Sequence, residues 1–202
     1  MNKKRLYFLG LITLIGFPLV GITIVGFVED QPRSFPWSFE QSWYMQLLIG
    51  AIVGVIAGFG AWRITLTKFM SDILNRYGKL VKSFKMNTWD SLFMSLCAGI
   101  GEEILFRGVI QHYWGIWLTA IFFVAIHGYL NPRDWRISIY GAYMTLVIAG
   151  IGYLYEYSGI VAAATAHAAI DFVLFTKMNN HRYQTETIEE KEPIDENEID
   201  TL

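Results

Sequence analysis

Cysteine and charge are both scarce in this sequence, and each scarcity argues against a class of protein. Cys97 is the only cysteine among the 202 residues, so an internal disulfide is impossible and a cysteine-based metal site is not expected. Charged residues make up 17% of the chain and hydrophobic residues 53%, whereas soluble domains carry about 25% charge. No basic cluster typical of nucleic-acid binding occurs. We therefore expect a membrane protein with no nucleic-acid partner.

Two familiar hydrolase motifs are absent as well. The sequence contains no Gly-x-Ser-x-Gly, so it offers no strong serine nucleophile. It also lacks His-Glu-x-x-His, so a catalytic metal would need ligands from separate helices. No internal repeat of the kind that marks many transporters is present.

Long apolar runs fill most of the first 176 residues instead. The first run, residues 6–28, is longer than the core of a signal peptide, so we interpret it as an uncleaved membrane span. A turn is predicted at Tyr113-Trp114-Gly115. The expected fold class is all-α, a polytopic membrane helix bundle of about six spans that forms an integral membrane domain over residues 1–176. The predicted spans are residues 6–28, 43–62, 88–112, 116–128, 137–155 and 160–176.

The distribution of charge predicts the topology. Residues 1–185 hold 15 Lys/Arg against 10 Asp/Glu, whereas residues 186–202 hold eight acids against one lysine. Three basic segments fall on one side of a six-span bundle, which marks the cytoplasmic side. They are residues 1–5, residues 63–87 and the loop with Arg133 and Arg136. We therefore expect a multi-pass protein of the plasma membrane, of bacterial type, with both termini in the cytoplasm. Residues 177–202 are predicted to be an acidic, disordered cytoplasmic tail.

Three local patterns predict how individual helices behave. Part of residues 63–87 is predicted to lie on the membrane surface as a basic amphipathic helix, and residues 29–42 to form a polar loop. Asn87 or Thr88 is expected to cap the next helix. The spacing Gly50-x-x-x-Gly54-x-x-x-Gly58 predicts the close approach of a second helix, with a specific dimer face as the alternative.

A cluster of charges interrupts the third apolar segment. Each unpaired charge inside a membrane costs on the order of 2.5–3.5 kcal/mol, so such residues must be paired, hydrated or used. Glu103 and Arg107 are four residues apart with the acid first, the favourable order for an ion pair on a helix. Glu102 points about 100° away from Glu103. It stays unpaired by this spacing and is a candidate general base.

Histidines and an aspartate on two further helices extend this polar set. His127 follows Phe123 by one helical turn, so both should face the same neighbour. His167 and Asp171 have the same four-residue spacing, so Asp171 can orient the imidazole, stabilise its charge or share a water with it. One glutamate and two histidines suit direct activation of water. They equally suit a catalytic metal, and both alternatives stay open.

Three short patterns in order resemble the signature motifs of the CPBP family. This family comprises the CAAX prenyl endopeptidases and the bacteriocin-processing or immunity proteins, and is also called the Abi family. The resemblance covers about residues 88–175, which makes residues 88–176 the expected catalytic core. The patterns are Glu102-Glu103-x-x-x-Arg107, Phe123-x-x-x-His127 and His167-x-x-x-Asp171.

The resemblance implies an intramembrane endopeptidase with a polar cavity inside the helix bundle. By the family pattern, Glu102 and His127 activate water, while His167 and Asp171 hold the oxyanion or the leaving group. The implied substrate is a membrane-associated peptide or protein, with the lipid bilayer as the surroundings. An ionised Asp171 only accepts hydrogen bonds, so it is either protonated, or works through His167, or ligates a metal.

The remaining implied roles concern support and cofactor. Glu103, Arg107 and Phe123 would hold the shape of the site. Zn²⁺ held by Glu102, His127 and His167 is one alternative, and a metal-free mechanism of glutamate and histidine is the other. 

Two other functions compete with the protease hypothesis. Family membership also permits a catalytically silent bacteriocin-immunity or membrane scaffold protein. Buried glutamate and histidine chains can relay protons as well, so a proton-coupled carrier is a third alternative. The small size and the absence of a repeat argue against the carrier.

Overall fold

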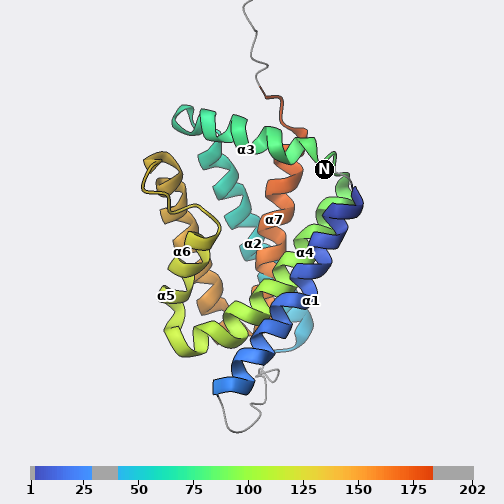
Figure 1. Cartoon of the computed structure of the whole chain (residues 1–202), viewed down its shortest axis with the longest axis vertical. Coiled ribbons are helices and arrows are strands. Elements are labelled where there is room, and N and C mark those ends of the chain that lie inside the picture. Colours follow the sequence, from blue (N-terminus) through green and yellow to red (C-terminus); the bar gives the residue numbers. More distant parts are fainter. Residues whose placement is uncertain (1–2, 29–40, 184–202) are drawn as a thin grey trace, which may run out of the picture.

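The computed structural model describes residues 3–28 and 41–183, and within these ranges every regular element is helical. Figure 1 shows a bundle of long helices with one shorter helix, α3, laid across one end. This confirms the expected all-α class. The elements are α1 (Lys3–Val28), α2 (Trp43–Thr65), the 3₁₀-helix η1 (Lys68–Met70), α3 (Ser71–Ser83), α4 (Thr88–Leu105), the π-helix η2 (Phe106–Ile110), α5 (Gln111–Ile126), α6 (Trp135–Ser158) and α7 (Ile160–Asn180).

Within residues 3–28 and 41–183, five stretches are long and apolar enough to cross a membrane, so the chain is a multi-pass membrane protein. One of them, Thr88–Ile126, merges the predicted third and fourth spans. It is broken at Gly115, whose φ of 72° and ψ of 174° suit glycine alone, so the predicted turn is confirmed there. The part of α5 after Gly115 is too short to span a bilayer by itself. The expected fourth span is therefore a short helical segment that turns back along the bundle.

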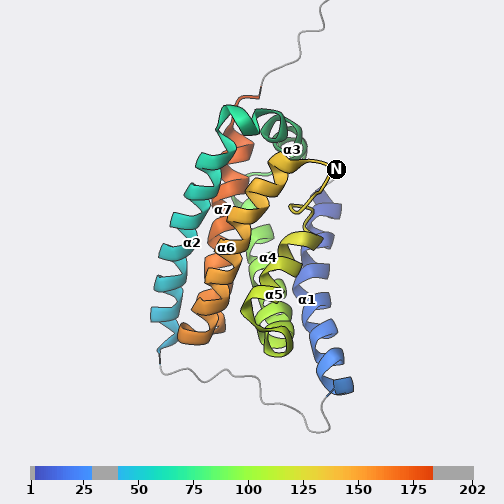
Figure 2. The same ribbon diagram turned by 90° about the vertical axis from the view of Figure 1, so that its left-hand side faces the viewer.

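Both ends of the described chain lie at the same end of the bundle as α3 (Figures 1 and 2). This arrangement agrees with a topology in which the termini share one side of the membrane. Helix α7 continues to Asn180, four residues past the predicted boundary at 176. The rest of the predicted tail, residues 184–202, and most of the predicted 29–42 loop, residues 29–40, lie outside the described residues.

The glycines spaced four residues apart on α2 pack against another helix of the same chain. A Cβ added at Gly54 would collide with the carbonyl oxygen of Ala166, and one added at Gly50 would collide with that of Ala162. At Gly58 the Cβ would lie 3.0 Å from Cβ of Val173. All three contacts are with α7. The predicted close approach of a second helix is therefore intramolecular, and the same glycines are not available as the alternative dimer face.

Substitution of Gly54 by valine should destabilise the protein by about 1–3 kcal/mol or more, because the added carbons meet backbone that cannot rotate away. The measurement is thermal or denaturant unfolding of the purified protein in detergent. Gly150→Ala is the matched control, since a Cβ there meets no described atom within 4 Å. Equal stability of the two variants would contradict the packing of α2 on α7.

Helix α3 is amphipathic, as predicted for part of residues 63–87. Leu74 is buried on its inner face, while Leu80 is 53% exposed on its outer face. Two polar contacts tie the helix to its neighbours. Asp72 pairs with Arg136 at the start of α6, at 2.7 Å, and Lys82 donates to the carbonyl oxygen of His181, just after α7, at 3.0 Å. These contacts fix α3 across the end of the bundle.

The predicted cap of α4 is present and has a second function. Asn87 accepts from the backbone N–H of Asp90, and the Asp90 carboxylate accepts from the backbone N–H of Asn87, both at 2.8 Å. The same carboxylate also binds Lys3 Nζ at 2.6 Å and the Tyr7 hydroxyl. The cap therefore also attaches the start of α1 to α4.

Candidate active site

The two adjacent glutamates of α4 have different environments. Glu103 is fully buried between helices, whereas Glu102 is 9% exposed. The α-helix then changes to the π-helix η2 at Phe106, and Arg107 lies in this segment. Single π-turns are uncommon and are often found at functional sites. The two adjacent carboxylates thus differ in exposure, one being fully enclosed and the other slightly exposed.

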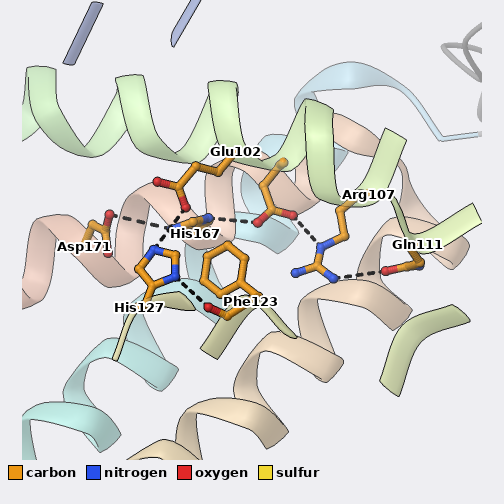
Figure 3. Close-up of polar contacts among 8 residues, drawn as sticks. Glu102, Arg107, Gln111, Phe123, His127, His167 and Asp171 are labelled. Carbon is orange, nitrogen blue, oxygen red and sulfur yellow. Dashed lines mark hydrogen bonds and ion pairs between the residues drawn. The ribbon is translucent and has the colours of Figure 1, made fainter. Parts of the chain in front are cut away.

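Glu103 binds two partners at once (Figure 3). Its Oε2 accepts from Arg107 Nε at 2.8 Å, which is the predicted ion pair. Its Oε1 lies 2.8 Å from Nδ1 of His167 on α7. A carboxylate oxygen facing Nδ1 orients the imidazole and leaves Nε2 for other contacts. Glu103 therefore joins α7 to α4, a contact that the sequence spacing did not predict.

The buried polar network continues from Arg107 away from the histidines. Arg107 Nη1 donates to Gln111 Oε1 at 3.1 Å. The amide nitrogen of Gln111 in turn donates to the carbonyl oxygen of Gly152 at 3.2 Å and to Glu156 Oε1 at 3.0 Å, both on α6. Sequence reasoning missed Gln111 and Glu156. The four-residue spacing of Arg107 and Gln111 was the one available signal.

His127 faces Glu102 at the end of α5. Its Nδ1 lies 2.7 Å from the Phe123 carbonyl oxygen, and its Nε2 lies 3.5 Å from Oε2 of Glu102. This Glu102 oxygen is buried and has no hydrogen-bond partner among the described residues. The Phe123 ring stacks on His127 with the ring centroids 4.3 Å apart, and meets His167 edge-on at 5.6 Å. Phe123 therefore contacts both imidazoles.

Asp171 lies beside the second nitrogen of His167. The distance from its Oδ2 to Nε2 is 3.7 Å, beyond hydrogen-bonding distance. Of the three relations considered from the sequence, orientation of the ring belongs to Glu103, which contacts Nδ1. Asp171 and Nε2 of His167 are near enough for charge stabilisation, and both residues line the cavity described below.

The four polar side chains open into one cavity of about 360 Å³. Glu102 comes from α4, His127 from the end of α5, and His167 and Asp171 from α7, as Figure 3 shows. The other walls are mostly apolar. Helix α3 also contributes to the lining, with Ile73, Leu74, Tyr77 and Val81. The structure thus contains the cavity expected inside the bundle, and it brings the sequence-predicted polar residues to it.

The donor geometry does not fit the metal alternative. In the described ranges, no group of three or more His, Cys, Asp or Glu side chains is placed to hold a metal ion. The suggested Zn²⁺ ligands were Glu102, His127 and His167. The chemistry is therefore derived from the side chains alone.

Comparison with known proteins agrees with the resemblance seen in the sequence. Residues 84–173 match the family model described as Type II CAAX prenyl endopeptidase Rce1-like. The uncharacterized protein YpbD of Bacillus subtilis (strain 168) is 32% identical over 111 residues, which cover 50% of this chain and 56% of that protein. The chain thus matches about half the length of this curated relative. No solved structure matches the chain significantly. The family description names an endopeptidase and gives no support to the immunity alternative.

Proposed function

Since residues 84–173 match the family model described as Type II CAAX prenyl endopeptidase Rce1-like, we propose that the chain is an intramembrane endopeptidase of this family. It hydrolyses a peptide bond in a membrane-associated peptide or protein. One observation carries the proposal: Glu102 Oε2, which has no hydrogen-bond partner among the described residues, faces His127 Nε2 across 3.5 Å inside a largely apolar cavity.

Glu102 and His127 activate the attacking water in this proposal. The Phe123 carbonyl oxygen can only accept, so Nδ1 of His127 carries a hydrogen and a neutral ring has its lone pair on Nε2. This lone pair and the Glu102 carboxylate are two neighbouring acceptors, which suits a water that donates one hydrogen to each. As the water oxygen bonds to the peptide carbonyl carbon, Glu102 accepts a proton. Glu102 then delivers that proton to the nitrogen of the leaving amine when the C–N bond breaks.

His167 stabilises the oxyanion in this proposal. Its Nδ1 donates to Glu103, so the ring is held with Nε2 toward the cavity. A protonated Nε2 donates to the carbonyl oxygen as negative charge develops there. Ionised Asp171 cannot donate itself. It acts through His167, because a carboxylate at 3.7 Å stabilises positive charge on the ring while the ring donates to the oxyanion.

Detection of new peptide termini tests the proposed activity. The purified chain is reconstituted in liposomes with a solubilised bacterial membrane fraction, and the peptides are read by mass spectrometry. We expect termini that appear with the wild-type chain and are absent without it. If none appears across membrane fractions from several bacteria, the proposal of an endopeptidase fails.

His127→Ala should lower the cleavage rate by about 10²–10⁴-fold, the usual contribution of a positioned acid or base. The measurement is the initial rate on a reporter peptide built from one of the detected cleavage sites. His112→Ala is the matched control, since His112 lies in the first turn of α5 and does not line the cavity. A His127→Ala variant with the wild-type rate would remove His127 from the mechanism.

A further inference from the structure

A second cavity lies at the end of the bundle that carries α3. It has a volume of about 500 Å³ and is formed where α2 and α7 end and η1 and α3 begin. Figures 1 and 2 show these segments meeting at the same end of the molecule. Two membrane spans end at this place, so the cavity is at the level of the lipid headgroups.

The polar lining of this cavity is cationic. Lys68 and Arg182 contribute positive charge, and His181 and Asn75 contribute further nitrogen atoms. None of the described residues that line the cavity is acidic. The side chains of Lys68, Asn75 and Arg182 make no hydrogen bond or ion pair with another residue of the described part of the chain. Three neighbouring groups with unused N–H donors and an excess of positive charge suit an anion with several acceptor oxygens.

The hydroxyl groups of the cavity are not additional donors. Thr65, Thr67 and Ser71 each donate to a backbone carbonyl oxygen three residues earlier, at 2.8, 2.8 and 2.9 Å. Recognition therefore depends on Lys68, Arg182 and Asn75. This dependence makes the cavity sensitive to the removal of two charges, which a surface coated with many equivalent cations would not be.

The apolar surroundings favour a lipid over a free ion. Leu66 lines the cavity and is 45% exposed, and Phe59, about two turns earlier on the same helix, is 44% exposed. Phe59 lies within the candidate span Trp43–Thr65, and Leu66 follows its last residue directly. A phosphate group bound by the cations would thus lie beside the exposed apolar side chains of Phe59 and Leu66. We propose that this cavity binds the phosphate of an anionic phospholipid headgroup, with the acyl chains along α2.

This second cavity also adjoins the cavity of the candidate active site. Thr65 and Leu74 line both cavities. A lipid bound here would therefore contact the two residues that form the shared wall at the junction of α2 and α3. This inference does not depend on the proposed peptidase activity, and it is tested by binding alone.

Lipid binding to the full chain in detergent provides the test. The probes are short-chain phosphatidylglycerol, phosphatidylcholine with the same acyl chains, and inorganic phosphate. We expect the wild-type chain to prefer phosphatidylglycerol to both other probes. Lys68→Gln/Arg182→Gln should weaken that binding about 30-fold, because one surface cation contributes about fivefold to the attraction. Use of the full chain means that acidic residues 186–202 compete equally in all variants.

Lys79→Gln/Lys85→Gln is the matched control, since it removes the same charge from exposed positions that do not line the cavity. Its affinity for phosphatidylglycerol should stay within about threefold of wild type. Equal weakening in both double variants would show diffuse attraction and overturn the site. Inorganic phosphate bound as tightly as phosphatidylglycerol would overturn the lipid assignment, and so would equal affinity for phosphatidylcholine.

Discussion

Glu102→Gln is expected to reduce peptide cleavage by about 10³-fold or more, to the level of the background. The amide keeps the size of the side chain but cannot accept the proton of the attacking water, and general-base catalysis alone is worth about 10²–10⁴-fold. Loss of the proton that Glu102 returns to the amine adds to the effect. The measurement is the initial rate on the reporter peptide in liposomes.

Glu156→Gln is the control for this substitution. Glu156 is also a carboxylate in a membrane helix, but it binds Gln111 and does not line the cavity. Both variants should elute as the wild type does and unfold at a similar temperature. A Glu102→Gln protein that cleaves at the wild-type rate would falsify the assignment of the general base.

Arg107→Met should destabilise the protein by about 3–5 kcal/mol, the second large effect that the structure predicts. The side chains of Arg107 and Glu103 are both 0% exposed, and removal of one partner of a buried ion pair leaves an uncompensated charge. Methionine replaces much of the lost volume, so the effect reports charge more than packing. The measurement is reversible denaturant unfolding in mixed micelles.

Asp72→Asn provides the comparison for an exposed ion pair. Asp72 binds Arg136 at 2.7 Å, but its side chain is 77% exposed. Exposed pairs contribute about 0–1 kcal/mol, so this variant should unfold near the wild-type midpoint. If Arg107→Met is as mild as Asp72→Asn, Glu103 is not the structural carboxylate of the site.

The spans and their local features could be predicted because they depend on residues close in sequence. Apolar runs located the membrane helices, a capping pattern located the start of α4 at Asn87, and Gly115 marked the break. The Glu103–Arg107 pair followed from helical spacing in the same way. The length of the fourth predicted span was not foreseen, because the helix after Gly115 is shorter than a membrane span, which hydropathy does not reveal.

Contacts between helices could not be predicted at this level. The sequence placed His167 and Asp171 on one face of a helix, but it gave no means of placing Glu103, 64 residues earlier, at Nδ1 of His167. Glu156 was placed beyond the predicted end of the fifth span, although α6 includes it and it binds Gln111. The packing of helices decides such contacts, and spacing within one helix contains no information about it.

The central claim is that residues 102 and 127 face each other across one cavity, and cysteine cross-linking tests it most directly. The variant Cys97→Ala/Glu102→Cys/His127→Cys is treated with a short bifunctional thiol reagent in liposomes, and the cross-linked peptide is identified by mass spectrometry. The control is His127→Cys with native Cys97, whose Sγ faces Gly10 on α1. The account predicts an efficient cross-link in the 102–127 pair and none in the control. Absence of the 102–127 cross-link, with both thiols reactive to a monofunctional reagent, would contradict it.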